Sequence, residues 1–181
     1  QPIDWTVKEQ ELATGNIDFI WNGFSITPER EEQLLMSDSY MENKQLIITM
    51  ADSEVNSKAD LSCKTITVQG ESSALEAVKK DQDFIDSLAS EPIEYATNLE
   101  CFKDVEAKRS DAIVVDEVLA RYYMHQNGPE KYKVLEDNFG EEVFAVGMRK
   151  DDKELKEALD NALRNLKENG KYDEIYSKWF N

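Results

Sequence analysis

Three short polar segments of the sequence carry groups able to hold a small charged molecule. The first spans Gly23 to Thr27, the second spans Gln69 to Ser73, and the third is the single residue Asp116. Each follows an apolar run typical of a buried strand. In open parallel sheets, ligands bind outside the carboxyl ends of the strands. We therefore expect these segments to provide a binding site for a zwitterion.

The chemistry of the side chains supports both ends of such a ligand. Arg30 can bind a carboxylate with its bidentate guanidinium fork, and backbone N–H groups near Ser73, at a helix N-terminus, favour the same anion. Asp116 is an acceptor for an ammonium group, and the Ser25 hydroxyl can assist. The aromatic face of Trp5 can cover the ligand body.

Each residue also has a purely structural interpretation. Arg30 can be solvated or pair with a neighbour on its own helix, and Trp5 can belong to the core. Ser73 and Asp116 can each cap a helix. Spacing alone leaves these alternatives open and predicts only an α/β ligand-binding protein.

The composition excludes some partners. The net charge is −17, with 21 basic and 38 acidic residues among 181. Such a surface repels phosphate backbones and anionic lipid, so we expect no nucleic-acid partner, and we interpret the charge as a solubility feature. No apolar run reaches the length of a membrane span. Because the sequence starts at Gln1 without a Met, we expect a mature or trimmed product.

Histidine and cysteine are too few for most catalytic or metal centres. His125 is the single histidine, and Cys63 and Cys101 form no Cys-x-x-Cys pair. We therefore expect no zinc site, no cofactor and no histidine-based nucleophile, with His125 at the end of a helix. Cys63 precedes its strand whereas Cys101 lies early in a helix that follows a strand, so the two thiols are expected to be far apart and unpaired.

The remaining sequence alternates short β-rich runs with helical stretches. Strands are predicted at 17–21, 46–50, 65–68, 93–96, 112–115 and 143–148, and helices at 5–14, from Thr27-Pro28 onward, from near Ser73, and at 98–108, 118–124, 155–166 and 172–179. Continuous apolar strands between helices predict a parallel sheet covered on both faces. The apolar stripes of the last two helices are predicted to be core.

Five motifs in order along the chain resemble the family 3 extracellular solute-binding proteins, the polar amino-acid-binding proteins of ABC importers. The motifs lie at Trp21–Arg30, Ser37–Tyr40, Asp60–Gln69, Ser110–Asp116 and Leu166–Phe180. The first resembles the Gly-x-Ser/Thr-x-Thr-x-x-Arg signature of that family. One such motif is weak support, whereas five in register cover essentially the whole chain.

The resemblance implies an α/β, periplasmic-binding-protein-like type II fold, with two lobes joined by a two-strand hinge. Residues 1–44 would form part of the first lobe, 45–139 the second lobe, and 140–181 the return to the first lobe with the C-terminal helices. Members of the family begin with a further strand, helix and strand that this sequence lacks. We therefore expect an incomplete first lobe with exposed apolar surface, repaired by self-association such as a swapped dimer, or a segment lost by trimming.

The resemblance also implies roles for eight ligand-binding residues, namely Trp5, Gly23, Ser25, Arg30, Gln69, Ser72, Ser73 and Asp116. Arg30 and the backbone amides of Ser25 and Ser73 would hold the α-carboxylate. Asp116, the Gly23 carbonyl and the Ser25 hydroxyl would hold the α-amino group. Trp5 would be the pocket aromatic, with Gln69 and Ser72 lining the second-lobe side.

The expected function is therefore the substrate-binding component of an ABC importer, which binds a polar L-amino acid and presents it to the transporter permease. The expected location is extracellular or periplasmic, with a lipid anchor in the full-length form. An alternative is a periplasmic dehydratase-like enzyme, for which Glu71 is the nearby candidate acid. A second alternative is a ligand-sensing domain of a receptor, although the end of the chain at the usual family terminus favours a free-standing protein.

Overall fold

The computed structural model describes residues 1–180. The chain forms two compact units: unit 1 contains Gln1–Lys8 and Glu42–Glu142, and unit 2 contains Glu9–Met41 and Val143 onward. Two long strands, β3 (Met41–Met50) and β7 (Tyr132–Met148), each contribute residues to both units. The sequence-based division counts residues 1–44 together, whereas the segment Gln1–Lys8 belongs to unit 1.

Unit 1 is built on a mixed sheet with the strand order β3-β6-β4-β5. The three strands β4 (Ile66–Gln69), β5 (Ile93–Tyr95) and β6 (Ala112–Asp116) are mutually parallel, as predicted. The prediction of a wholly parallel sheet is wrong for β3, which runs antiparallel to β6. A parallel neighbour needs a long crossover, usually with an α-helix, and the β3–β4 connection carries only the 3-10 turn η2 (Lys58–Leu61).

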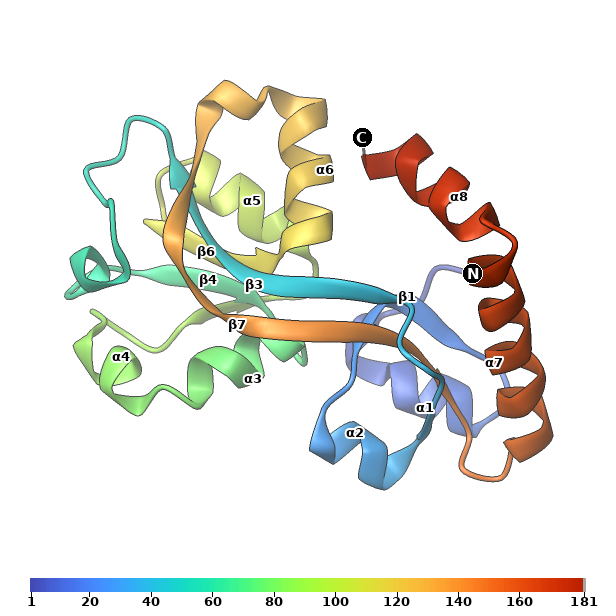
Figure 1. The fold of residues 1–181 in the computed structure, drawn as a ribbon. Coiled ribbons are helices and arrows are strands. Elements are labelled where there is room, and N and C mark those ends of the chain that lie inside the picture. The colour runs from blue at the N-terminus through green and yellow to red at the C-terminus, as the bar shows by residue number, and fades with distance from the viewer. Residues whose placement is uncertain (181) are drawn as a thin grey trace. The chain divides into compact units, whose positions relative to one another are not determined.

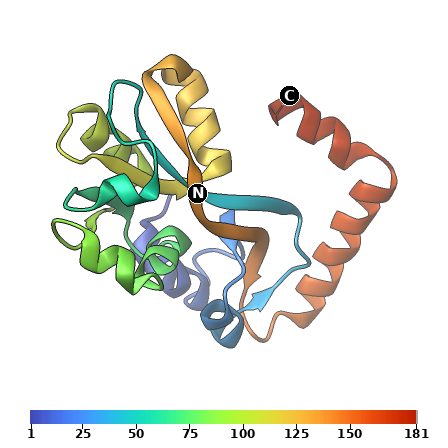
Figure 2. The same cartoon turned by 60° about the vertical axis from the view of Figure 1, so that its left-hand side comes forward.

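Helices cover both faces of this sheet, as the continuous apolar strands predicted. Helices α3 (Ser73–Lys79) and α4 (Gln82–Ser87) lie on one face, and α5 (Asn98–Glu106) and α6 (Glu117–Asn127) lie on the other (Figure 1 and Figure 2). Successive strand residues alternate between the two cores. Ile47 packs on the α3 and α4 side, whereas its neighbours Leu46 and Ile48 pack on the α5 and α6 side.

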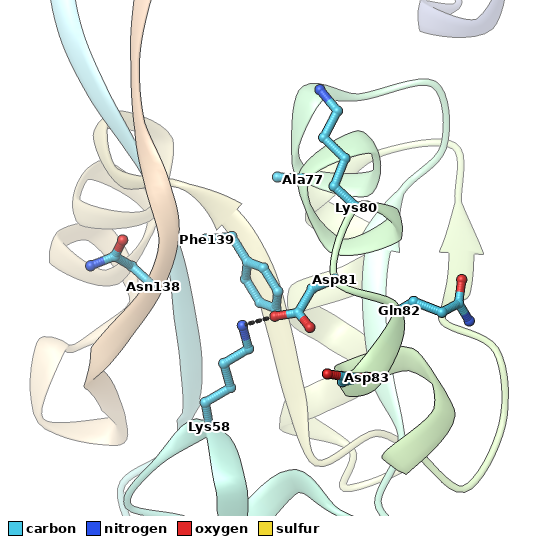
Figure 3. A pocket seen from close by; sticks show the side chains of 8 residues that line it. All are labelled: Lys58, Ala77, Lys80, Asp81, Gln82, Asp83, Asn138 and Phe139. Atoms are coloured by element: carbon cyan, nitrogen blue, oxygen red, sulfur yellow. Dashed lines mark hydrogen bonds and ion pairs between the residues drawn. The ribbon is translucent and has the colours of Figure 1, made fainter.

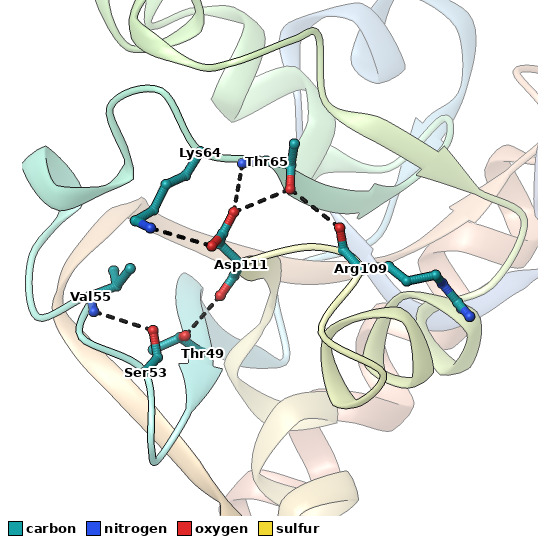
Figure 4. A network of polar contacts seen from close by, with 7 residues as sticks. All are labelled: Thr49, Ser53, Val55, Lys64, Thr65, Arg109 and Asp111. Carbon is teal, nitrogen blue, oxygen red and sulfur yellow. Dashed lines mark hydrogen bonds and ion pairs between the residues drawn. The ribbon is translucent and has the colours of Figure 1, made fainter.

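A polar network joins the starts of β4 and β6. The Asp111 carboxylate accepts from the Thr65 backbone N–H at 2.9 Å, from the Thr65 hydroxyl at 3.2 Å and from Lys64 at 3.5 Å. The Asp111 carbonyl accepts from the Thr49 hydroxyl at 2.7 Å, which adds β3 (Figure 4). These contacts fix the register in which the parallel strands enter the sheet.

A second polar network is buried beneath α5. The Asp104 carboxylate accepts from the Tyr95 hydroxyl at 2.8 Å, from Arg109 and from the Ser110 hydroxyl. Asp104 is buried, so these donors replace the water that its charge would otherwise require. The network ties α5 to β5 and to the segment that leads into β6.

Unit 2 contains α1 (Lys8–Ala13, whose first residue belongs to unit 1), β1 (Ile20–Ser25), α2 (Pro28–Gln33), β2 (Leu35–Met36), the end of β7, α7 (Lys153–Glu168) and α8 (Lys171–Phe180). Strands β1 and β2 both pair antiparallel with β7. The Thr27 side chain accepts from the Arg30 backbone N–H and Pro28 is the first helical residue, so the predicted start of α2 is confirmed. The short 3-10 helices η1 (Trp5–Val7) and η3 (Pro129–Lys131) belong to unit 1.

Two sequence-based predictions in unit 2 are wrong. The strand predicted at 17–21 begins only at Ile20, and Trp21 is 50% exposed rather than buried. The apolar stripe of α8, predicted to be core, is exposed, with Trp179 at 64%. An amphipathic stripe shows that a helix has an apolar face, but whether another element covers that face depends on tertiary packing.

Candidate functional site

Asp116 stands at the end of β6 and directly before α6, yet its side chain does not cap that helix. It accepts instead from the side-chain amides of Asn43, at 2.8 Å, and Gln45, at 2.7 Å. Gln45 lies opposite Asp116 in the β3–β6 register, and this pairing brings the two side chains together. The capping alternative for Asp116 is therefore wrong.

The same two amides hold a second carboxylate. Asn43 Nδ2 and Gln45 Nε2 each donate to Glu142 Oε1 at 2.6 Å. Gln45 Nε2 also lies 3.2 Å from the Ser73 hydroxyl, so unit 1 joins two predicted site residues, Ser73 and Asp116, through a residue that was not predicted.

Sequence reasoning missed Asn43, Gln45 and Glu142 because it began the relevant strands too late. The strand was predicted from residue 46 and the last one from 143, whereas β3 begins at Met41 and β7 at Tyr132. Polar residues at 43 and 45 share one face of a strand, which is the signal that a longer strand would have provided.

The pKa of Asp116 is raised to about 7. Burial of the carboxyl group is the largest cause, and the charge of Glu142 is the second, while hydrogen bonds from Gln45 and Asn43 act in the opposite direction. Asp116 as a residue is partly exposed, but its carboxyl group points inward to the amides. This carboxyl group is therefore enclosed, charge-sensitive and close to its titration point at neutral pH.

The turn from Gln69 to Ser73 has its side chains engaged in local structure. The Ser72 hydroxyl accepts from the Leu75 backbone N–H and donates to the Gln69 carbonyl at 2.6 Å, so Ser72, and not Ser73, caps α3. The Gln69 amide donates to the Ala96 carbonyl at 2.9 Å and accepts from Asn98 at 2.9 Å. Ser73 is the first residue of α3, which corrects its interpretation as a cap.

Trp5 lies against this turn. Its indole N–H donates to the Glu71 carbonyl at 3.2 Å, and Lys8 Nζ donates to the same carbonyl at 3.3 Å. The Lys8 ammonium is also 5.0 Å from the Trp5 ring centroid. Glu71 has a φ of +55°, which presents its carbonyl to these donors while its side chain is exposed. Unit 1 thus brings together Trp5, Gln69, Ser72, Ser73 and Asp116.

Unit 2 gathers the other three predicted residues. Arg30 is only 6% exposed, its guanidinium lies 4.2 Å from the Phe24 ring centroid, and it donates to the Ser25 carbonyl at 2.9 Å. The solvated interpretation of Arg30 is therefore wrong. Gly23 has a φ of +58°, and a Cβ there would lie 3.3 Å from the Phe144 ring. Close packing and backbone conformation together favour glycine at this position.

A separate hollow of about 580 Å³ lies beside the C-terminal end of α3. Figure 3 shows Lys58 and Asp81 directed toward one another beside the Phe139 ring, with an ion pair of 2.5 Å. None of the eight predicted site residues lines this hollow. Within residues 1–180, no group of three or more metal-binding side chains could hold an ion, and no helix could span a membrane.

The comparisons with known structures define the class of protein. A histidine-bound ABC uptake transporter substrate binding protein from Streptococcus pneumoniae matches with a TM-score of 0.96 and 38% identity, over 99% of this chain and 74% of that one. The arginine-, lysine-, histidine-binding protein ArtJ from Geobacillus stearothermophilus matches at 0.88 and 32% identity, over 99% and 77%. The fold is periplasmic-binding-protein-like type II, as the sequence predicted.

The sequence comparisons identify the family. The model of the bacterial extracellular solute-binding proteins, family 3, matches residues 1–181, and the chain belongs to that family. The arginine-binding extracellular protein ArtP of Bacillus subtilis is 27% identical over 99% of this chain and 69% of its own length. The glutamine-binding protein GlnH of the same organism is 26% identical over 93% and 59%. The chain thus spans roughly two thirds of these relatives.

Proposed function

We propose that this chain is the ligand-binding part of a substrate-binding component of an ABC importer, and that its ligand is a polar L-amino acid. Arg30, with the Ser25 and Ser73 backbone amides, would hold the α-carboxylate. Asp116, with the Gly23 carbonyl and the Ser25 hydroxyl, would hold the α-ammonium group. Trp5, Gln69 and Ser72 would line the site, with residues 1–44 and 140–181 as one lobe and 45–139 as the other.

The observation that carries the proposal is the environment of Asp116. Its side chain is turned away from the helix that it precedes, and its described partners are two neutral amides and a second carboxylate. The ionised form of a carboxylate in this setting is stabilised by a cationic ligand, because none of these partners supplies positive charge. An amino acid's ammonium group has that charge and three donors.

The relatives support a polar or cationic side chain on the ligand. Their names specify arginine for ArtP, glutamine for GlnH, and histidine for the bound pneumococcal protein. We propose arginine, glutamine and histidine as the first candidates for this chain, with presentation to an ABC transporter permease after binding.

A thermal-shift screen of the proteinogenic L-amino acids tests this function. A ligand at about one hundred times its Kd stabilises the native state by about 2.7 kcal/mol, which corresponds to a rise in Tm of about 5 to 10 °C for a chain of this size. Arg30→Lys, which keeps the charge but removes the bidentate fork, should weaken binding at least about tenfold. Arg164→Lys is the matched control, since Arg164 is exposed in unit 2. No shift with any amino acid would contradict the proposal.

We further propose that copies of the chain associate through unit 2. Apolar side chains are exposed along α8, namely Ile175, Tyr176, Trp179 and Phe180, and Trp21 is exposed on β1. Exposed apolar patches of this kind mark interaction surfaces. Light scattering should show a dimer that Trp179→Glu dissociates, and a monomer at every concentration would contradict this arrangement.

The proposed function does not include catalysis, and it places the full-length protein outside the cytoplasmic membrane on a lipid anchor. The curated relatives are binding proteins, but the fold also occurs in an ancestral amino acid-binding protein, AncCDT-1, a precursor of cyclohexadienyl dehydratase, at a TM-score of 0.86 and 30% identity. Incubation with prephenate distinguishes the two functions, because turnover would show an enzyme. Membrane fractionation of cells that express the full-length protein tests the anchor.

A further inference from the structure

The N-terminal segment of the chain contacts the turn that follows β4. Residues Gln1–Lys8 belong to unit 1, together with β4 and the turn Gln69–Ser73. Trp5, which the proposed function places against the ligand, lies in the 3-10 helix η1, and its indole N–H reaches the Glu71 carbonyl 66 positions further along the chain. The groups that hold Trp5 in this position therefore bear on the ligand site.

Local hydrogen bonds fix the backbone of this segment. The Asp4 carboxylate accepts from the Thr6 backbone N–H at 2.9 Å and from the Thr6 hydroxyl at 2.8 Å. The Lys8 backbone N–H donates to the Trp5 carbonyl and closes the 3-10 turn. In such a turn, side chains three residues apart lie on the same side. The local geometry therefore brings the Lys8 side chain next to the Trp5 ring.

The Lys8 side chain is almost wholly buried, with only 3% of the residue exposed. A lysine is rarely buried to this extent unless its ammonium group has partners. Two of its partners are the Glu71 carbonyl, at 3.3 Å, and the Trp5 ring, whose centroid lies 5.0 Å from Lys8 Nζ. A cation over the face of a tryptophan ring is attracted by the ring's electrons, and this attraction grows when water is excluded. The burial of Lys8 is thus coupled to the position of Trp5.

A single carbonyl oxygen joins the lysine, the indole and the turn. The Trp5 indole N–H donates to the Glu71 carbonyl at 3.2 Å, and the Lys8 ammonium group donates to the same oxygen. Glu71 has a φ of +55°, a conformation that residues with a side chain rarely adopt. Such a conformation persists when surrounding contacts hold it. The two donors hold the Glu71 carbonyl in place, and the carbonyl in turn orients the indole.

The buried lysine is adjacent to a segment that is otherwise near the surface. Trp5 is only partly buried, and η1 contributes no buried residue of its own. Segments with few buried residues open more easily than the core of a domain. The first buried side chain after η1 is that of Lys8, and its ammonium group contacts both the ring and the carbonyl that the ring binds. Lys8 is therefore suited to hold Trp5 in one orientation.

We propose that Lys8 is a positioning residue, whose ammonium group holds the Trp5 ring in the orientation in which it covers the bound amino acid. Lys8 acts through Trp5 and does not need to touch the ligand. A binding group that is already ordered raises affinity, because less conformational freedom is lost when the ligand binds. This inference rests on the proposed function and deepens it, since it names the residue that prepares the aromatic side of the site.

Isothermal titration calorimetry measures the effect on binding, with whichever of L-arginine, L-glutamine and L-histidine gives the largest thermal shift. Lys8→Met keeps an unbranched apolar side chain but removes the charge and the donor. It should weaken binding about two- to tenfold, the effect expected when one more side chain must be ordered. Lys8→Gln, which keeps a donor but no charge, should give an intermediate affinity. Lys103→Met, at an exposed position of α5, is the matched control and should leave the affinity unchanged.

A double-mutant cycle distinguishes the positioning role from a general loss of structure. If Lys8 acts through the Trp5 ring, Lys8→Met should have little further effect on affinity once Trp5 is replaced by Ala. If the lysine supports the site in some other way, the effects of the two substitutions on the binding free energy will add. Full additivity would therefore overturn the positioning role.

The fluorescence of Trp5 tests the contact without a ligand. The chain has three tryptophans, so Trp21→Phe and Trp179→Phe together leave Trp5 as the single emitter. In this background Lys8→Met should increase the fast component of the time-resolved anisotropy decay, because the indole gains motion on the nanosecond timescale. Acrylamide should also quench the indole more strongly. Lys103→Met should change neither quantity.

The outcomes separate this inference from the proposed function. Unchanged affinity or unchanged Trp5 anisotropy in Lys8→Met would overturn the positioning role and leave the proposed function intact. Failure of the wild type to bind any amino acid would overturn the proposed function, and with it the role of Lys8 in binding. The anisotropy of the ligand-free protein would still decide whether Lys8 holds the Trp5 ring.

Discussion

Replacement of Asp104 by Asn tests how the segment that leads into β6 is held in place. Asp104 is buried on α5 and accepts from Tyr95, Arg109 and Ser110. Asn is nearly the same size, but it has one acceptor oxygen instead of two, and its NH₂ group must face at least one of these donors. The substitution therefore removes hydrogen bonds without creating a cavity.

The expected loss is about 2 to 3 kcal/mol of unfolding free energy, because hydrogen bonds to a buried charged group are stronger than neutral ones and a buried donor is left unpaired. Arg109 adds little to this figure because it is largely exposed and its ion pair is screened. A loss of this size lowers the Tm by about 4 to 12 °C for a chain of this length. Circular dichroism during urea and thermal unfolding measures both quantities.

The pH dependence identifies the cause. Burial opposes ionisation of Asp104, but the hydrogen bonds from Ser110, Arg109 and Tyr95 outweigh it, and the pKa is lowered. A lowered folded pKa gives stability that is present above the unfolded pKa and lost as pH falls through the folded pKa. The gap between wild type and Asp104→Asn should therefore be full at about pH 7 and shrink below about pH 4.

The control is Asp83→Asn, at an exposed position of α4, which should change stability by less than about 0.5 kcal/mol. A gap for Asp104→Asn that stays constant down to about pH 3 would show that packing, and not the charge, is responsible. A loss below about 0.5 kcal/mol would refute the reasoning altogether.

Three further predictions concern the core and the thiols of unit 1. Phe102→Ala should lower the free energy of unfolding in urea by about 3 to 5 kcal/mol, because Phe102 is fully buried and its ring centroid lies 4.0 Å from that of Tyr123. Leu99→Ala, on the exposed face of the same helix, should have little effect. Equal effects of the two substitutions would contradict this packing. Asp111→Asn should cost about 1 kcal/mol through weaker bonds to Thr65, and a neutral result would show that water replaces them. The two cysteines are unpaired, as expected from the sequence. Ellman's reagent should label exposed Cys63 in the native protein and reach Cys101 only after denaturation, because Cys101 is buried and its burial raises the pKa of the thiol to about 11. Two fast-reacting thiols in the native protein would contradict the burial of Cys101.

The sequence predicted helices and strands well where their position depends on interactions between residues that are close in the chain. The start of α2 follows from Thr27 and Pro28, because capping and a fixed proline φ are local effects. The buried run from Ala112 to Val115 gave β6 and placed Asp116 at its end. The cap of α3 was misassigned by one residue, since Ser72 and Ser73 have equally suitable hydroxyls and only the backbone conformation selects between them.

Predictions that depend on distant segments were less successful. The first residues of β3 are polar and show no apolar alternation, so the pairing of this part of the strand with β6 could not be predicted. The contacts that Asn43 and Gln45 make with the carboxylates of Asp116 and Glu142 were missed for the same reason. The apolar residues of α8 recur with the period of an amphipathic helix, but their side chains are exposed. Their burial would require another element packed on this face, and the periodicity of one helix carries no information about such an element.

The sequence by itself determined the family and the α/β alternation, because motif spacing and local propensity are properties of neighbouring residues. The family resemblance added a prediction of eight ligand-binding residues. The tertiary structure alone decided which of these groups remain available. It buried Arg30 against Phe24, bound the Gln69 amide to the Ala96 carbonyl, engaged Ser72 in its own turn, and placed Glu142 beside Asp116. Such contacts join residues up to about a hundred positions apart, and their electrostatic effects depend on distance and burial, which no local pattern encodes.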